Sequence, residues 1–302
     1  MSEGKWFYTS MTARHRDRRD IVSIRTGIDF VDQKIIGLNK KEISLFSGFR
    51  AAGKSTILTQ IALQVVNEGK KVALFSGEMD EARVFDWTYL IAAGRSYTLP
   101  TKYENYFEIK SEATPAIKTW LEQKLFVYNN DCGNDLEGLF LKLKYCIEVK
   151  SVDVIILDNL MSIDIGADDK NKNSKQTAFI WRVKDFAKDN DVHVILVAHP
   201  RKCESGILRI DDISGTADLT NAADNVFLLH RVTSDFKRCA KALFRWPEEH
   251  ELLSVDNILE VAKNRDLGVV DEMAGLIFDR RSKQMSCDGT EICYGWRSDN
   301  GR

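Results

Sequence analysis

Residues 48–56, with the sequence GFRAAGKST, have the types and spacing needed to hold phosphate. Gly48 and Gly53 let the backbone turn its N–H groups toward phosphate oxygens, and a following helix adds the partial positive charge of its N-terminus. Lys54 supplies a charge for the β- and γ-phosphates, and the Ser55 hydroxyl can bind Mg²⁺. We expect ATP, or another NTP or dNTP, with Mg²⁺. The predicted nucleotide-binding residues are Gly48, Phe49, Arg50, Ala51, Ala52, Gly53, Lys54, Ser55 and Thr56.

Two carboxylates end apolar segments further along the chain. Asp158 closes VDVIILD, where it can hold the metal through water or accept a hydrogen bond from Ser55. Glu78 closes KKVALFSGE, where it can orient and deprotonate an attacking water. An acidic residue in this position can equally cap the helix that follows. The residues alone do not choose between these two roles of Glu78.

These side chains need a scaffold in which several strand ends meet. From residue 42 onward, apolar β-rich segments alternate with helical segments. Continuous apolar strands between helices indicate a parallel sheet that is covered on both faces. The carboxyl ends of parallel strands lie along one edge, which is where ligands bind. The fold class is therefore predicted as α/β with a P-loop core.

The chain organisation predicts one large domain over residues 22–286. Residues 1–21 are assigned to an N-terminal arm, either solvated or docked on a neighbouring subunit, and residues 287–302 to a polar C-terminal tail. Residues 231–256 interrupt two apolar segments and are predicted as an excursion between two strands.

Composition limits the partners and the compartment. The net charge is −2, so a nucleic-acid site would need locally concentrated cations rather than a basic surface. The six cysteines form no C-x-x-C pair, which disfavours zinc and favours a reducing compartment. No apolar run of about 18 residues occurs, so no membrane partner is expected. A cytoplasmic location is expected, with the mitochondrial matrix as the alternative.

The motifs in their order resemble a known family. TGIDFVDQKIIGLNKKEISLFSG is similar to the opening of RecA-like ATPase domains. FSGEMDEARV, VIILDNL, VILVAHPRK, DISGTADLTNAADNVFLL and LEVAKNRDLG then resemble the helicase domain of DnaB-type (superfamily 4) replicative ring helicases. The motifs are most similar to those of Twinkle and the phage primase–helicases, over residues 22–286. The resemblance implies a RecA-like core with a mostly parallel central sheet and helices on both faces.

The resemblance also implies roles for particular residues. It makes Glu78 the catalytic base and His199 the sensor of the γ-phosphate. It makes Arg265 an arginine finger and Lys263 its companion, both reaching the nucleotide of the neighbouring subunit. The family forms hexameric rings that hydrolyse ATP between subunits and move single-stranded DNA through the centre in the 5′→3′ direction.

Two polar loops are the expected contacts to DNA, since in the family the matching loops line the channel. They cover residues 166–176 and 201–215, and ordinary solvated loops are the alternative reading. Gly215 and Asn221 match the turn and amide positions that follow the second loop in the family. The predicted DNA-binding residues are Lys170, Lys172, Lys175, Arg201, Lys202 and Arg209.

Other functions remain open at this point. A RecA-like recombinase or recombination mediator would coat DNA as a filament, and a KaiC-like regulatory ATPase would not move along DNA. For a ring helicase, a primase or a polymerase is a candidate partner besides other copies of the chain. The first 21 residues cannot hold a primase module or a helical domain, so we expect a helicase-domain fragment or a compact stand-alone relative.

Overall fold

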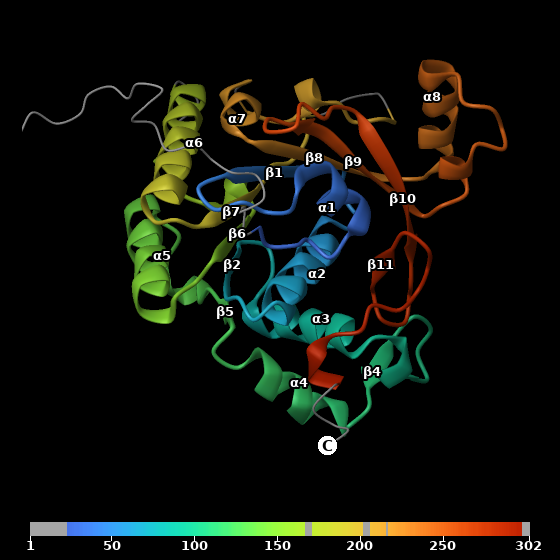
Figure 1. The fold of residues 1–302 in the computed structure, drawn as a ribbon, viewed down its shortest axis with the longest axis horizontal. Helices are drawn as coiled ribbons and strands as arrows, with labels where there is room; N and C mark the ends of the chain where they lie inside the picture. The colour runs from blue at the N-terminus through green and yellow to red at the C-terminus, as the bar shows by residue number, and fades with distance from the viewer. Residues whose placement is uncertain (1–22, 167–170, 202–205, 216, 298–302) are drawn as a thin grey trace, which may run out of the picture.

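A nine-stranded sheet forms the centre of the molecule (Figure 1). The computed structural model of the chain describes residues 23–166, 171–201, 206–215 and 217–297. In these residues the strand order is β11-β10-β9-β8-β1-β7-β6-β2-β5. The strands are β1 (Ile43–Gly48), β2 (Val72–Ser76), β5 (Leu125–Val127), β6 (Val154–Asp158), β7 (His193–Val197), β8 (Asn225–Arg231), β9 (Asn257–Asn264), β10 (Glu272–Phe278) and β11 (Met285–Ser286).

The neighbouring strands β5, β2, β6, β7, β1 and β8 all run parallel to one another. β9, β10 and β11 continue the sheet beyond β8, each antiparallel to its neighbour. The carboxyl ends of the parallel strands therefore lie along one edge. β1 ends at Gly48 and β6 ends at Asp158, while Glu78 and His199 come two residues after β2 and β7. The topology thus brings four predicted site segments to the same edge of the sheet.

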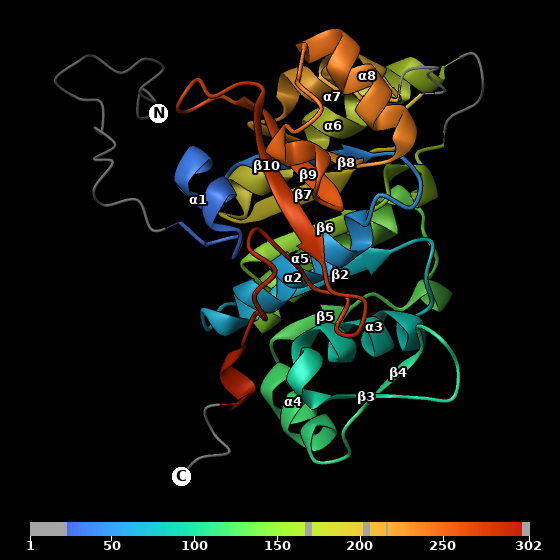
Figure 2. The same cartoon turned by 90° about the vertical axis from the view of Figure 1, so that its right-hand side faces the viewer.

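Helices cover both faces of this sheet (Figures 1 and 2). Because successive strand residues point to opposite faces, Ile156 packs in the cluster under α1 to α4 and Ile155 in the cluster under α5, α6 and α7. The predicted α/β fold, with a mostly parallel central sheet between two helical layers, is confirmed. The helices are α1 (Asp29–Ile35), α2 (Lys54–Asn67), α3 (Glu81–Ala93), α4 (Ala113–Leu121), α5 (Leu136–Lys150), α6 (Lys172–Asp189), α7 (Ala217–Ala222) and α8 (Ser234–Phe244).

The predicted excursion between two strands is present. α8 and a short 3-10 turn at Glu251–Leu253 lie between β8 and β9, and α8 stands at one extremity of the molecule (Figure 1). At the end opposite α8 in Figure 2, α4 and the small hairpin of β3 (Thr98–Pro100) and β4 (Phe107–Ile109) follow α3. In the described part of the chain, no helix is both long and apolar enough to cross a membrane.

The residues after β11 differ from a polar tail over the part that the structure describes. Tyr294 and Trp296 are 3% and 1% exposed, in the same apolar cluster as α2 and α3. Trp296 Nε1 donates to the Ala92 carbonyl at 2.8 Å, and its ring meets Tyr97 edge-on with centroids 4.9 Å apart. These aromatic contacts make residues 287–297 part of the packed domain.

Candidate functional site

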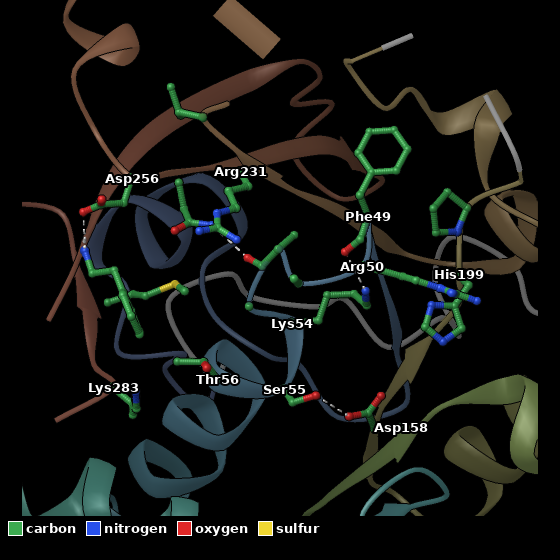
Figure 3. Close-up of a pocket in the computed structure, with 18 of the residues that line it drawn as sticks. Phe49, Arg50, Lys54, Ser55, Thr56, Asp158, His199, Arg231, Asp256 and Lys283 are labelled. Carbon is green, nitrogen blue, oxygen red and sulfur yellow. Dashed lines mark hydrogen bonds between the residues drawn. The ribbon is translucent and has the colours of Figure 1, made fainter. Parts of the chain in front are cut away.

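The phosphate loop joins β1 to α2, and its backbone is fixed by close contacts (Figure 3). Gly53, directly before α2, has a φ of 91°, which side chains rarely adopt. A Cβ on Gly53 would lie 2.3 Å from Met285 Cε, and one on Gly48 would lie 2.6 Å from the Leu229 carbonyl oxygen. The backbone conformation at Gly53 and the close carbonyl at Gly48 therefore favour glycine at the two positions where phosphate binding also requires it.

Asn257, the first residue of β9, holds the loop from outside. Its Nδ2 donates to the Ala52 carbonyl at 2.8 Å, and its side chain is buried. Within the loop, the Ala52 N–H donates to the Phe49 carbonyl at 3.2 Å. The shape of the loop thus depends on a residue that no spacing rule in the sequence pointed to.

Lys54 lies on the inner side of the loop (Figure 3). Its Nζ donates to the carbonyls of Gly48 at 2.7 Å and Phe49 at 3.1 Å. Burial lowers the pKa of Lys54, and the charges of Asp158 and Glu78 oppose that shift. The ammonium is therefore enclosed by the backbone that would surround a phosphate.

Ser55 and Asp158 form a pair beside Lys54. The Ser55 hydroxyl donates to Asp158 Oδ2 at 3.0 Å. Burial raises the pKa of Asp158, and the hydrogen bond from Ser55 opposes the shift. A hydroxyl and a carboxylate are hard oxygen donors of the kind that Mg²⁺ takes from a protein when phosphates and waters complete its coordination. The pair fits the predicted metal position.

Glu78 and His199 meet at the same edge. His199 Nε2 lies 3.0 Å from Glu78 Oε1, and Asn159 Nδ2 lies 2.5 Å from that oxygen and 2.9 Å from the imidazole nitrogen. Asn159 Oδ1 accepts from the Met161 N–H at 2.8 Å, which leaves its amide nitrogen facing the pair. Asn159 is a site residue that no motif predicted, although it stands directly after Asp158 in the sequence.

The capping alternative for Glu78 does not hold. The N-cap of α3 is Asp80, whose Oδ1 accepts from the Arg83 N–H at 2.8 Å. The Glu78 side chain is 57% exposed and turns to His199 and Asn159 instead. A carboxylate on the cavity side, beside an imidazole, is free to meet a water.

One cavity of about 1660 Å³ joins these groups (Figure 3). Phe49 to Thr56, Glu78, Asp158 and His199 all line it. The wall opposite the phosphate loop is formed by the ends of β8 and β10 and the start of β9. These three segments matched no motif in the sequence. The charged lining is mostly cationic: Arg50, Lys54, Arg201, Arg231, Lys237, Arg280 and Lys283 against Glu78, Asp158 and Asp256.

The predicted finger and its companion lie at the end of β9. Because β9 is antiparallel to β8, this end lies beside the amino ends of the parallel strands, away from the phosphate loop. Gly48 pairs with Leu229, near the end of β8, whereas Asn264 pairs with Asn225 at the start of β8. Four residues separate the two positions on β8, which is about 13 Å of strand. The antiparallel direction of β9 causes this separation.

Lys263 and Arg265 are bound at that edge. Lys263 Nζ donates to the carbonyls of Thr220 at 2.7 Å and Ala223 at 3.0 Å, at the end of α7. Burial lowers the pKa of Lys263, as does the neighbouring Arg265, while the charge of Asp224 opposes the shift. In the described part of the chain, neither residue lines the cavity.

The structure separates the predicted DNA-binding residues. Arg201 lines the cavity and its Nη2 donates to the Gly215 carbonyl at 2.6 Å. The Arg209 guanidinium lies over the Phe244 ring of α8, 5.9 Å from its centroid. The expected loop of residues 166–176 is shorter than predicted, because α6 begins at Lys172, and Lys175 is exposed near the start of this helix. Lys170, Lys202 and the side chain of Lys172 lie outside the described residues.

Comparisons with known proteins identify the family. Residues 29–205 match the family model of the AAA domain. The replicative DNA helicase DnaB of Treponema pallidum (strain Nichols) is 20% identical over 224 residues, which are 74% of this chain and 51% of that protein. The chain thus spans about half the length of this curated relative.

Two solved structures share the fold. One, described as an ATPase domain, superposes with a TM-score of 0.69 at 15% identity, over 88% of this chain and 91% of that one. A DnaB-like replicative helicase, described with its interactions with primase, gives a TM-score of 0.70 at 14% identity, over 90% of this chain and 64% of that one. These likenesses confirm the RecA-like P-loop core. The chain belongs to the AAA domain family, and the predicted resemblance to the helicase domain of DnaB-type replicative helicases is confirmed.

Proposed function

We propose that this chain is the ATP-hydrolysing motor domain of a DnaB-type replicative DNA helicase. The observation that carries the proposal is the shared cavity. The phosphate loop, the Ser55–Asp158 pair and the Glu78–His199 pair meet in it, at the ligand-binding edge of the sheet. Such a cluster suits the hydrolysis of a nucleoside triphosphate. The similarity to DnaB-type helicases supports the proposal that this hydrolysis drives work on DNA.

The cavity is suited to a triphosphate because its charged lining is mostly cationic. In the proposed reaction, Lys54 and the loop N–H groups hold the β- and γ-phosphates. Mg²⁺, held by Ser55 and Asp158, would supply charge neutralisation at the phosphate oxygens. The residues of the chain thereby bind and orient the γ-phosphate for attack from the side of Glu78.

Glu78 accepts a proton from the attacking water in this proposal. Its Oε1 lies beside His199 Nε2 and Asn159 Nδ2, which restrict where the carboxylate can point. His199 follows β7 and continues into residues 201–215, so a contact to the γ-phosphate would act directly on that loop. The Ser214 N–H donates to the His199 carbonyl at 2.8 Å, which ties the far end of the loop to the sensor.

The catalytic site is proposed to lie between two subunits. Lys263 and Arg265 are held at the sheet edge opposite their own phosphate loop, so they can complete only a site on another copy. Head-to-tail contacts of this kind close into rings when the rotation between copies permits. We propose a hexameric ring that translocates 5′→3′ on single-stranded DNA, as the resemblance implies.

Primase is proposed as a protein partner, because one structural neighbour is a DnaB-like replicative helicase described with its primase interactions. A cytoplasmic location fits a replicative role and the bacterial relative. The DNA-binding role of the segment after β6, including the start of α6, and of the loop after β7 rests on the resemblance and on their Lys and Arg content.

The proposed function is tested by strand displacement on forked duplexes in which either the 5′ or the 3′ tail is blocked. We expect ATP-dependent unwinding only when the 5′ tail is free, because a ring that moves 5′→3′ must thread that tail. Electron micrographs of the same sample should show closed rings. Filaments without unwinding would favour a recombinase, and nucleotide turnover that ignores DNA would favour a regulatory ATPase.

Replacing Arg201 by alanine is expected to weaken binding to single-stranded DNA and to flatten its salt dependence. Each lost phosphate contact reduces the slope of log affinity against log salt by about 0.7 for a single strand. Fluorescence anisotropy with labelled oligonucleotide at several salt concentrations measures both quantities. Because Arg201 also lines the cavity, nucleotide affinity is measured in parallel. A loss of nucleotide affinity with unchanged DNA affinity would instead place Arg201 in the nucleotide site.

A further inference from the structure

The Asp224 carboxylate binds two cations at the edge where β9 ends. Its Oδ1 accepts from Arg265 Nη1 at 3.3 Å, and its Oδ2 accepts from Lys184 Nζ of α6 and from the Ile43 N–H at 2.9 Å. The Asp224 N–H donates to the Ile43 carbonyl at 2.9 Å, and the Arg265 N–H donates to the Asp224 carbonyl at 2.8 Å. Both the backbone and the side chain of Asp224 are therefore fixed.

The two cations differ in their surroundings. The Lys184 side chain is 6% exposed and that of Asp224 is 11% exposed, so they form a buried ion pair. Burial of a carboxylate is tolerated when a cation and further donors satisfy it, and Lys184 with the Ile43 N–H already does so. The Arg265 side chain is 49% exposed and binds the other oxygen. Its contact is thus not needed to compensate the buried charge.

The contact does fix the direction of Arg265. Nη1 is held by the carboxylate, and Nη2 donates to the Asn221 carbonyl at the end of α7. A planar guanidinium held through two of its nitrogens has a defined plane as well as a defined position. It has five N–H donors in all, so others remain for an anion from outside.

We propose that Asp224 is the positioning residue of Arg265. It holds the guanidinium at the surface in the orientation that a phosphate of the neighbouring subunit requires. This inference rests on the proposed function, in which Arg265 completes the neighbour's nucleotide site. Asp224 itself does not touch nucleotide, since it lies at the opposite edge from its own phosphate loop and is more buried than the guanidinium.

Replacing Asp224 by asparagine is expected to lower kcat for DNA-stimulated ATP hydrolysis by about 10- to 100-fold, because misplacing a catalytic group by an ångström can cost about 100-fold. Asparagine keeps the size and can still accept from the Ile43 N–H, but it loses the charge that holds Arg265. The KM for ATP should change by less than about threefold, since the phosphate loop is untouched.

Lys184→Met is the matched control, because it breaks the same buried pair but leaves Oδ1 on Arg265. We expect its kcat to stay within about threefold of the unchanged protein, even where thermal unfolding shows a stability loss like that of Asp224→Asn. The double variant Lys184→Met/Asp224→Asn removes both buried charges and should recover stability relative to the single variants. It should remain slow, because Arg265 still lacks its carboxylate. A double variant with full kcat would overturn the proposal.

Mixed rings distinguish a misplaced Arg265 from damage to the nucleotide site of the Asp224→Asn subunit itself. Asp224→Asn subunits keep an intact Glu78, and Glu78→Ala subunits keep an intact finger, so a mixture contains complete interfaces. We expect the mixture to hydrolyse ATP faster than either variant alone. If Arg265→Ala with Glu78→Ala shows this rescue and Asp224→Asn with Glu78→Ala does not, the proposal for Asp224 is wrong and the shared site stands. If neither mixture is rescued, the shared site itself fails.

Discussion

Replacing Arg265 by alanine is expected to abolish nearly all DNA-stimulated ATP hydrolysis, with a loss on the order of 10³-fold or more in kcat. An arginine finger neutralises charge that develops on the transferred phosphoryl group. Its companion Lys263 is bound to the Thr220 and Ala223 carbonyls and is not expected to replace it. Arg265 is held at the sheet edge opposite its own phosphate loop. Nucleotide affinity should stay nearly unchanged, because every phosphate loop is intact and the finger acts mainly on charge that develops in the transition state. Titration with a fluorescent nucleotide measures this affinity.

Mixing the Arg265→Ala variant with Glu78→Ala subunits should restore part of the activity. At an interface where the Glu78→Ala subunit presents its Arg265 to the Arg265→Ala subunit, the base and the finger are both present. Steady-state hydrolysis as a function of mixing ratio should pass through a maximum between two nearly inactive ends. Arg238→Ala is the matched control, since Arg238 is an exposed arginine of α8 whose side chain pairs with Asp235. A hydrolysis rate that changes linearly with the mixing ratio, without a maximum, would argue against a shared site.

The nucleotide loop and the sheet could be predicted from sequence because their signals are local. The loop is one contiguous motif, and the central strands are apolar runs that are buried on both faces. Asp158 was located by the apolar strand that it ends, and His199 by the resemblance of its motif. The same local logic could not show that Asn257 supports the loop, because β9 reaches it only through the sheet order.

The direction of β9 in the sheet could not be predicted from the sequence either. A motif on a late strand does not say whether that strand is parallel or antiparallel, and the answer decides which edge receives Lys263 and Arg265. Aromatic residues near the C-terminus were also misjudged as part of a polar tail. Tyr294 and Trp296 stand in the short apolar segment ICYGW between Glu291 and Arg297, and only the tertiary contact with the cluster of α2 and α3 shows that they are buried.

Replacing Glu78 by glutamine is expected to lower kcat by about 10²- to 10⁴-fold, the range that general acid–base catalysis supplies. Glutamine has the same shape and can still face His199 and Asn159, but its amide cannot accept the proton of the attacking water. ATP should still bind, since Lys54 and the loop are intact. Single-turnover hydrolysis, measured beside nucleotide affinity, separates the chemical step from binding.

Asp80→Asn in the same loop is the control for this substitution. Asp80 caps α3 through the Arg83 N–H, and asparagine is an equally good N-cap, so neither stability nor hydrolysis should change much. A charge effect of the loop as a whole would slow both variants, whereas a general base at Glu78 slows one. If Glu78→Gln hydrolyses ATP at the unchanged rate, the Glu78–His199 pair has only a structural role, and the water must be activated elsewhere in the cavity. Glu78 is not needed to cap α3, because Asp80 does so. If removing only the charge of Glu78 slows hydrolysis, that charge acts in the chemical step.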